Sequence, residues 1–322
     1  MRPYLLLTVI PGLLLAGGAV HAQQKYPTKP IRVIVPFVPG GASDIVARVM
    51  TQKLAEGFGI SVVADNRPGG GGTIGSEIVV KASPDGYTML LAGGSYASNA
   101  ALYKLPYDPL HDVTPIGQIG ETGYLVTLNP SVPVKSIKEL IAHDKASPGK
   151  LNYASGGTGS SNHLATELFN QMAGTRMTHV PYKGTAQSIS DVIGGQIQVI
   201  LGTLPLVIPQ VKSNRLRGLA VTSARRSNAM PDIPTVAESV PCYEAVQWYA
   251  VVGPKGLPRD IVTRWSNEIK RILNLPEVKE RMTGDGVELS DGGTPERFRE
   301  MLKSDVAKWQ KVVKDANIKA GS

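Results

Sequence analysis

Short apolar runs alternate with amphipathic helical patterns along most of the chain, and this alternation constrains the fold more than any other feature. A run of about five apolar residues is typical of a buried strand, whereas apolar residues three and four positions apart are typical of a helix. Strands that alternate with helices form mostly parallel sheets with helices on their faces, so the expected fold class is α/β. We expect nine strands, at residues 31–35, 60–64, 87–92, 123–128, 151–154, 177–181, 196–201, 216–222 and 249–253.

Helix ends carry clearer signals than strand ends. Residues 44–56 place apolar side chains on one face, and we expect Gly57 to end that helix. Ser136 with Glu139 forms the pattern of a capping box. Two long amphipathic helices are expected near the C-terminus, one at residues 260–273 and one that begins at Thr294 and Pro295.

The chain has no low-complexity segment that could serve as a linker. Two lobes without a linker are expected to be joined by strands that cross between them. Residues 123–128 are the expected outward crossing and residues 249–253 the expected return. This predicts one lobe from residues 23–123 together with 249–322, and a second lobe from residues 124–248.

The N-terminal segment has the pattern of a secretory signal peptide. Arg2 precedes an apolar run, and the small residues Val20 and Ala22 stand at positions −3 and −1 of a cut after Ala22. A membrane anchor is the alternative, but the run falls short of the ~20 apolar residues that a spanning helix needs. We therefore predict that residues 1–22 are a signal peptide and that the mature chain acts in the periplasm.

Charge and composition exclude several classes of protein. The formal net charge is +8, but the basic residues are scattered and lack interleaved aromatic residues, so no nucleic acid partner is expected. The single cysteine, Cys242, has no partner for an intrachain disulfide. The histidines lack the spacing of metal ligands. We expect no metal, no cofactor and a monomeric protein.

Two glycine-rich corners each follow a predicted strand and precede a predicted helix. The first glycine corner lies within "VPFVPGGASD" (residues 35–44), and the second is "SGGTGS" (residues 155–160). Glycine lets a ligand approach the main chain closely, and the first N–H groups of a helix favour an anion without any Lys or Arg. Either corner alone could be only a tight turn. Together, in different predicted lobes, they are expected to grip the two ends of an anionic ligand.

Two other motifs suggest different functions, but each lacks part of its pattern. Residues 70–75 satisfy the GxGxxG pattern of a dinucleotide site, but no acidic residue follows at the end of a second strand, so we interpret them as a surface loop. Ser160 or Ser161 with His163 would suit an ester hydrolase, yet the GxSxG motif is missing. We interpret the two serines as helix caps, and a secreted serine-dependent ester hydrolase remains the alternative.

Six stretches, which together span most of the chain after residue 25, resemble one known family. They are "YPTKPIRVIVPFVPGGASDIVAR" (26–48), "NRPGGGGTIGSEIVVKASPDGYTML" (66–90), "LYKLPYDPLHDVTPI" (102–116), "SPGKLNYASGGTGSSNHLATELF" (147–169), "HVPYKGTAQSISDVIGGQIQV" (179–199) and "LAVTSARRSNAMPDIPTVAES" (219–239). In this order they closely resemble the Bug family of periplasmic solute-binding receptors of tripartite tricarboxylate transporters.

The resemblance implies a two-lobed periplasmic binding protein of the Venus-flytrap, type II-like kind. Each lobe would be a mostly parallel sheet flanked by helices, and crossing strands would join the two. Such a receptor is not an enzyme. It closes on a small organic mono-, di- or tricarboxylate, holds it through main-chain amides and waters, and delivers it to the membrane subunits of the transporter. Presentation of the ligand to a signalling sensor is an alternative use.

The resemblance also implies site residues. Matching motif positions assign ligand contacts to Phe37, Gly40, Gly41 and Ala42 in the first corner and to Gly157, Thr158, Gly159, Ser160 and Ser161 in and after the second. Tyr182, Lys183 and Gly184 are further candidates, although Lys183 fits a solvated loop equally well.

Two more positions differ from many relatives. Ser95 and Tyr96 lie in a loop where small hydroxyl residues are common, so Tyr96 is expected to narrow the pocket. Thr203 stands where many relatives carry an acidic or amide residue. Its neutral side chain favours a carboxylate without an amino group.

Overall fold

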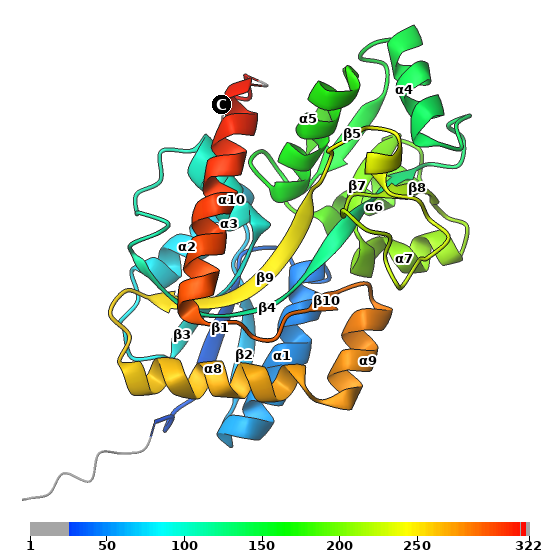
Figure 1. Ribbon diagram of the computed structural model, residues 1–322. Helices are drawn as coiled ribbons and strands as arrows, with labels where there is room; N and C mark the ends of the chain where they lie inside the picture. Colours follow the sequence, from blue (N-terminus) through cyan, green and yellow to red (C-terminus); the bar gives the residue numbers. More distant parts are fainter. Residues whose placement is uncertain (1–25, 316, 320–322) are drawn as a thin grey trace, which may run out of the picture.

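The computed structural model describes residues 26–315 and 317–319 (Figure 1). The predicted signal peptide at residues 1–22 lies outside the described residues. Within them, no helix combines the length and the apolar character needed to cross a membrane.

The strands form one ten-stranded mixed sheet in the order β2-β1-β3-β9-β4-β7-β5-β6, and β8 and β10 also pair with β4. Most pairs among β1, β2, β3, β5, β6 and β7 are parallel, whereas β9 and β4 are antiparallel to their neighbours. The strands are β1 (Ile31–Val35), β2 (Val62–Asn66), β3 (Thr88–Gly93), β4 (Val113–Leu128), β5 (Asn152–Ser155), β6 (Thr178–Pro181), β7 (Val199–Thr203), β8 (Arg217–Val221), β9 (Val246–Pro254) and β10 (Glu288–Leu289).

One long strand, β4, runs through both parts of the sheet. Its residues 113–123 pair with β9, and its residues 124–128 pair with β7. We call the part with β1, β2, β3, β9 and β10 half A, and the part with β5 to β8 half B. Figure 1 shows β4 and β9 side by side, running from half A toward half B. The strand β4 changes partner between Gly123 and Tyr124, at the start of the predicted outward crossing, whereas residues 249–253 of the predicted return pair with β3 and β4 within half A.

Helices cover both faces of half A because its strands alternate their side chains between two cores. In β1, Ile31, Val33 and Val35 pack with α1, α8 and α9, whereas Ile34 packs with α2, α3 and α10. The helices are α1 (Ala42–Phe58), α2 (Thr73–Val80), α3 (Gly94–Leu102), α4 (Ile137–Ala146), α5 (Ser161–Ala173), α6 (Thr185–Ile193), α7 (Leu204–Lys212), α8 (Arg259–Leu273), α9 (Pro276–Gly284) and α10 (Pro295–Asp315), with 3-10 turns η1 (Gly70–Gly72) and η2 (Val236–Glu238).

Two predicted helix ends differ from the structure. Gly57 does not end α1, which continues to Phe58 and ends at Gly59 in a left-handed conformation with φ 71°. Ser136 caps α4 as predicted by accepting a hydrogen bond from Glu139 N. The Glu139 carboxylate, however, accepts from Lys135 N instead of completing the capping box.

Several elements were not predicted, among them the helices α2, α6, α7 and α9. Residues 113–122 of β4 contain Pro115, Gly117 and Gly120, which interrupt the apolar pattern and coincide with two irregularities in its pairing with β9. The segment expected to be a loop around Ser95 and Tyr96 is the helix α3. The two-residue strand β10 is too short to carry a pattern of its own.

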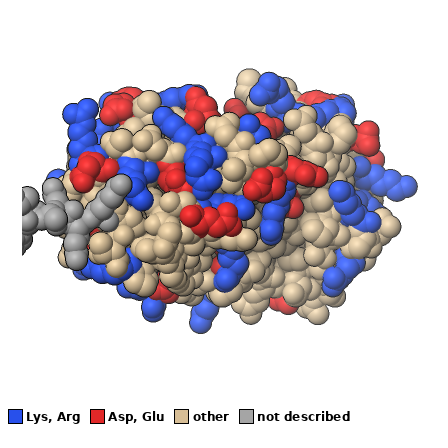
Figure 2. Space-filling model, turned by 90° about the horizontal axis from the view of Figure 1, so that it is seen from below, with Lys and Arg blue, Asp and Glu red and all other residues tan. Residues whose placement is uncertain are grey.

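The described surface that faces downward in Figure 1 mixes charges of both signs. Figure 2 shows Lys and Arg side chains interspersed with Asp and Glu side chains on this face. The described residues include exposed ion pairs such as Arg226–Glu238 and Arg297–Asp291. The net positive charge is therefore spread among neighbouring charges of opposite sign.

Candidate functional site

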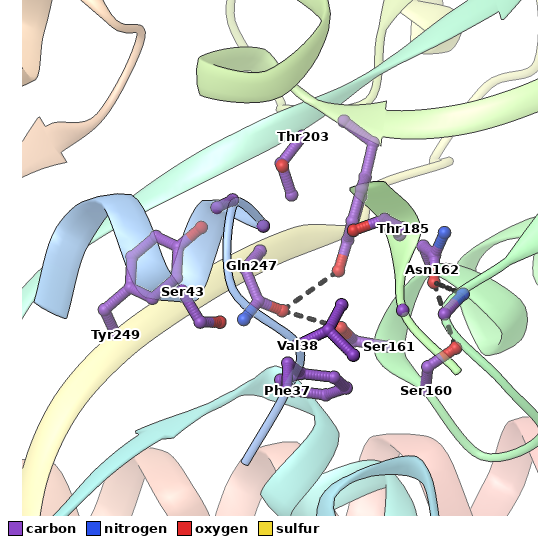
Figure 3. A pocket seen from close by; sticks show the side chains of 15 residues that line it. Phe37, Val38, Ser43, Ser160, Ser161, Asn162, Thr185, Thr203, Gln247 and Tyr249 are labelled. Carbon is purple, nitrogen blue, oxygen red and sulfur yellow. Dashed lines mark hydrogen bonds between the residues drawn. The ribbon is translucent and has the colours of Figure 1, made fainter. Parts of the chain in front are cut away.

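A pocket lies between the two halves, with a volume of about 40 Å³ for the centres of water-sized molecules. One water needs roughly 10–15 Å³ on this measure, so the space has room for about three water-sized groups. Figure 3 shows side chains from both halves around it. The lining residues are Phe37, Val38, Gly41, Ala42, Ser43, Tyr124, Gly156, Ser160, Ser161, Asn162, Gly184, Thr185, Thr203, Gln247 and Tyr249.

Four helices begin at this pocket. The residues that precede α1, α5, α6 and α7 are Gly41, Ser160, Gly184 and Thr203, and all four line it. None of these helices has a side chain that caps its first N–H groups. The first N–H groups of a helix have no partner within the helix and carry partial positive charge. The residues that line the pocket include no Asp, Glu, Lys or Arg, so its electrostatic character comes from the main chain and favours an anion.

The first glycine corner is held by Asp44 and Asn66. The Asp44 carboxylate accepts hydrogen bonds from Gly40 N (2.9 Å), Arg48 Nε (2.8 Å) and Asn66 Nδ2 (3.0 Å). Burial acts to raise the pKa of Asp44, but these hydrogen bonds outweigh it and lower the pKa. Asp44 is therefore ionised and bonded to Gly40, Arg48 and Asn66, and it does not line the pocket.

The two glycines of this corner have different requirements. Gly40 has φ +80°, a conformation that side-chain-bearing residues rarely adopt. Gly41 has φ −78°, which any residue tolerates. Gly40 thus shapes the turn, whereas Gly41 lines the pocket.

The second glycine corner satisfies its polar groups internally. Ser160 Oγ donates to Gly157 O (2.6 Å), and the Asn162 Oδ1 atom accepts from Ser160 Oγ and Gly156 N. Ser160 lies at the N-cap position of α5 as predicted, but its side chain makes no bond to a first-turn N–H, and Ser161 is the first residue of the helix, with its Oγ donating to Gln247 Oε1 (2.6 Å). The first N–H groups of α5 are thereby left to a ligand.

Two stacked imidazoles lie beneath the second corner. The ring centroids of His163 and His179 are 4.0 Å apart, and Tyr153 stacks on His179. His163 Nδ1 accepts a hydrogen bond from Gly159 N (3.2 Å). Burial, with the neighbouring His179 as a second cause, lowers the pKa of His163 to about 3, and burial lowers the pKa of His179 to about 4. Both rings are therefore neutral at physiological pH, so His163 Nδ1 carries no proton and can accept the hydrogen bond from Gly159 N.

The hydroxyls do not form a hydrolase site. Neither Ser160 nor Ser161 bonds a histidine. Ser155 Oγ lies 2.6 Å from His179 Nε2, but Ser155 is fully buried and does not line the pocket. A substrate in the pocket therefore meets no serine paired with a histidine base.

Gln247 is a central residue that sequence reasoning missed. Its Oε1 atom accepts from Ser161 Oγ and from Tyr124 OH (3.1 Å), so β9, β4 and α5 meet at one amide (Figure 3). The available signal was a glutamine inside the otherwise apolar stretch VQWYAVV. The other lining residues that were not predicted are Val38, Ser43, Tyr124, Gly156, Asn162, Thr185 and Tyr249.

Two hydroxyls at the pocket have no partner within the described residues. Thr203 Oγ1 and Tyr249 OH are buried without a hydrogen bond, and both residues line the pocket. Leaving a buried hydroxyl unpaired costs free energy, so both are suited to a polar group of a ligand.

Of the predicted site residues, Phe37, Gly41, Ala42, Ser160, Ser161, Gly184 and Thr203 line the pocket. A second, wider hollow shares Phe37 and Gly156 with it and is lined by the predicted Gly157, Thr158, Tyr182 and Lys183. Gly40 and Gly159 shape the corners beside the pocket without lining it, and Ser95 is buried outside it.

Two predictions about neighbouring segments are corrected. Tyr96 does not narrow the pocket, since its hydroxyl donates to Pro109 O and its ring stacks on Tyr107. The glycines at residues 69–72 are not a plain surface loop, because they line the second hollow opposite Gly157 and Thr158.

Comparisons with known proteins agree with this geometry. Residues 46–318 match the family model described as tripartite tricarboxylate transporter family receptor. Protein BugT of Bordetella pertussis (strain Tohama I) is 35% identical over 321 residues, which cover 98% of each chain. The structure of R. palustris Rpa4515 with adipate is 36% identical, with a TM-score of 0.88, and covers 91% of this chain and 99% of its own. The structure of the periplasmic binding protein BugD is 32% identical, with a TM-score of 0.87, and covers 91% and 99%.

Proposed function

The chain belongs to the tripartite tricarboxylate transporter receptor family, whose members are periplasmic solute-binding proteins, and on this premise we propose that it captures a small organic carboxylate in the pocket between its halves and delivers it to the membrane subunits of such a transporter. The observation that carries the proposal is the set of four helix N-termini that open onto one pocket without a charged side chain. The family consists of solute-binding proteins rather than enzymes.

The main chain can supply enough free energy for such a ligand. A hydrogen bond to a charged group contributes about 1.5–3 kcal/mol, and a micromolar complex needs about 8 kcal/mol. Three main-chain N–H groups would therefore provide most of the affinity, and the N-terminal dipoles and the apolar contacts of Phe37 and Val38 would add to it.

The ligand we propose is a mono-, di- or tricarboxylate without an amino group. An ammonium group needs a carboxylate or carbonyl partner, and no acidic side chain lines the pocket. Adipate, which is bound in the structure of Rpa4515, is a carboxylate of this kind. The hydroxyls of Thr203 and Tyr249 are available for a second polar group of the ligand.

The proposed lobes are residues 23–123 with 249–322, and residues 124–248. The change of partner in β4 between Gly123 and Tyr124 supports the first boundary. On the return, β9 already pairs with β4 from Val246, three residues before the predicted crossing at 249. We further propose that residues 1–22 are removed on export to the periplasm, which the mass of the purified mature protein would test.

A ligand screen tests the proposed function. The mature protein is mixed with succinate, adipate, malate, citrate and benzoate, with glutamate as an amino-bearing control and putrescine as a cationic control. An acid at a hundred times its dissociation constant stabilises by about 2.7 kcal/mol, which raises Tm by about 5 °C or more. If none of the acids raises Tm, or if putrescine raises it as much as they do, the proposal is wrong.

Delivery needs a separate experiment. Cells that lack this chain should lose uptake of the radiolabelled acid found in the screen, and the wild-type chain should restore it. A receptor that serves only a signalling sensor would leave uptake unchanged while a transcriptional response to the acid disappears.

A further inference from the structure

The helix α3 of half A lies against the second glycine corner of half B. Ser98 Oγ donates to Gly159 O (2.7 Å), and Tyr103 OH donates to Thr158 O (3.0 Å). Asn99 Nδ2, between them in sequence, donates to Gly71 O (2.9 Å) in the turn η1. One helix thus bonds main-chain carbonyls of two separate loops.

Two glycines at this contact, Gly159 and Gly71, have no room for a side chain. A Cβ atom at Gly159 would lie 2.6 Å from Tyr103 Cε2 and 2.7 Å from Asn99 Oδ1. A Cβ atom at Gly71 would lie 2.7 Å from Thr158 O. Ser98 and Asn99 are almost fully buried here, so their bonds are shielded from water, whereas Tyr103 is partly buried and lines the second hollow.

The N-terminal end of α3 makes a further contact with half B. A Cβ atom at Gly94 would meet Gln247 Oε1 at 3.0 Å and Ser161 Cβ at 3.2 Å. Gln247 Oε1 accepts the hydroxyl of Ser161 at the start of α5. The full length of α3 therefore follows the corner from Thr158 to Ser161.

We propose that Ser98 and Tyr103 form a latch that holds the two halves together, and that both are positioning residues that set how long a bound carboxylate stays. Thr158 and Gly159 belong to the corner that leads into the pocket-lining Ser160 and Ser161. Separating the halves must break the bonds to those two carbonyls. The effect on ligand residence rests on the proposed function, whereas the latch itself does not.

One buried polar atom beside the latch opposes it. Asn99 Oδ1 is buried without a hydrogen-bond donor, and a buried unpaired acceptor costs free energy. This cost favours separation of the two halves. The apparent affinity for a ligand that binds the latched form is then proportional to the fraction of molecules in that form.

The experiment compares a double variant, Ser98→Ala with Tyr103→Phe, to the wild type. Both changes remove a hydroxyl and keep the helix and the ring. Tyr96→Phe is the matched control, because its hydroxyl bonds Pro109 O within half A and does not cross to half B. Amide hydrogen exchange of residues 156–162 is measured without added ligand, and the dissociation rate of adipate is measured by stopped flow.

We expect the double variant to exchange residues 156–162 and to release adipate about tenfold faster or more, since two hydrogen bonds are lost. Tyr96→Phe should leave both rates within about twofold of the wild type. Unchanged exchange in the double variant, or an equal increase in the control, overturns the latch. Faster exchange with an unchanged adipate release rate overturns its role in residence time. Faster exchange in a protein that no acid stabilises keeps the latch and rejects the proposed function.

Discussion

At the scale of single residues, the site depends on side chains that hold the main chain of the two corners in place. His163 accepts Gly159 N–H, and Asn162 Oδ1 accepts Gly156 N–H. Asp44 fixes Gly40 N–H in the first corner. These side chains fix the corners, so that the N–H groups at the helix starts remain available to an anion.

The neutral histidine pair predicts a pH dependence of stability. The folded pKa values of about 3 and about 4 lie below the value of an unfolded histidine. As the pH falls below about 6.5, the unfolded chain binds protons that the folded chain does not, so the free energy of unfolding falls by up to about 1.4 kcal/mol per pH unit for each histidine. Above pH 6.5 the two histidines do not change how the free energy of unfolding depends on pH. Urea unfolding at pH 7.5, 6.5, 5.5 and 4.5 measures this.

His179→Phe keeps the ring stacking but cannot be protonated, so it should reduce the slope between pH 6.5 and 4.5 by up to about 1.4 kcal/mol per pH unit. His111→Gln is the control, because His111 is exposed and pairs only with Asp108. A slope that is the same in wild type and in His179→Phe would contradict the neutral state of His179.

A substitution at Gly41 is expected to weaken ligand binding without changing the stability of the fold. A Cβ atom there has only Val38 O within 4 Å, at 3.6 Å, and φ −78° allows any residue. Gly41→Ala should therefore keep Tm within about 2 °C and weaken binding of the selected acid tenfold or more, since the methyl group takes space in a small pocket. Calorimetric titration measures the affinity. Wild-type affinity in Gly41→Ala would remove Gly41 from the site.

At the scale of elements, the site is made by where helices begin. The helices α1, α5, α6 and α7 start at the carboxyl ends of β1, β5, β6 and β7. Neighbouring parallel strands place these ends at one edge of a sheet, which is where ligands bind in α/β folds. The glycine turn η1 adds a contact between the halves that none of these helices provides.

The close contact of η1 gives a prediction for Gly71. Gly71→Ala introduces both an unfavourable φ of +62° and a contact of 2.7 Å with Thr158 O. Gly256→Ala is the matched control, with φ +84° and nothing within 4 Å. Backbone strain alone costs about 1 kcal/mol, so we expect Gly71→Ala to lose at least about 1 kcal/mol more than the control and to weaken binding. Urea unfolding measures the free energy of unfolding of both variants. Equal losses in Gly71→Ala and Gly256→Ala would show that η1 is not in close contact with the second corner.

At the scale of the whole molecule, the two halves share more than the pocket. The strand β4 is continuous through both, and one apolar core contains Leu90 and Trp309 of half A together with Leu164 and Phe169 of half B. The structure has the α/β periplasmic-binding-protein fold of BugD and Rpa4515. Motion of the halves is expected to be centred on β4 and β9, which link them.

The shared core predicts one cooperative unfolding transition. The tryptophans Trp248, Trp265 and Trp309 all belong to elements of half A, so fluorescence reports on that half, whereas far-UV circular dichroism reports on both. We expect the two urea transitions to coincide. Midpoints that differ by more than about 0.3 M would show that half B unfolds separately.

The sequence by itself determined the α/β class, most strand positions and the two glycine corners. These follow from local rules, because burial periodicity and glycine turns are read within a few residues. The periplasmic-binding-protein fold was predicted from the family resemblance, and the comparisons confirm this prediction. Residues such as Phe37, Gly41 and Ser161 were assigned to the site by the family resemblance, at positions in and beside those corners, and they line the pocket.

Only the tertiary structure decided which distant residues complete the site. Gln247, Tyr249 and Tyr124 lie on strands far in sequence from either corner, and nothing local marks them as pocket residues. Tyr96 was placed wrongly because its segment forms a helix whose other side faces the second corner. The role of residues 69–72 likewise depends on a contact with Thr158, some 90 positions away. Such contacts depend on how the halves meet along β4, which no short stretch of sequence encodes.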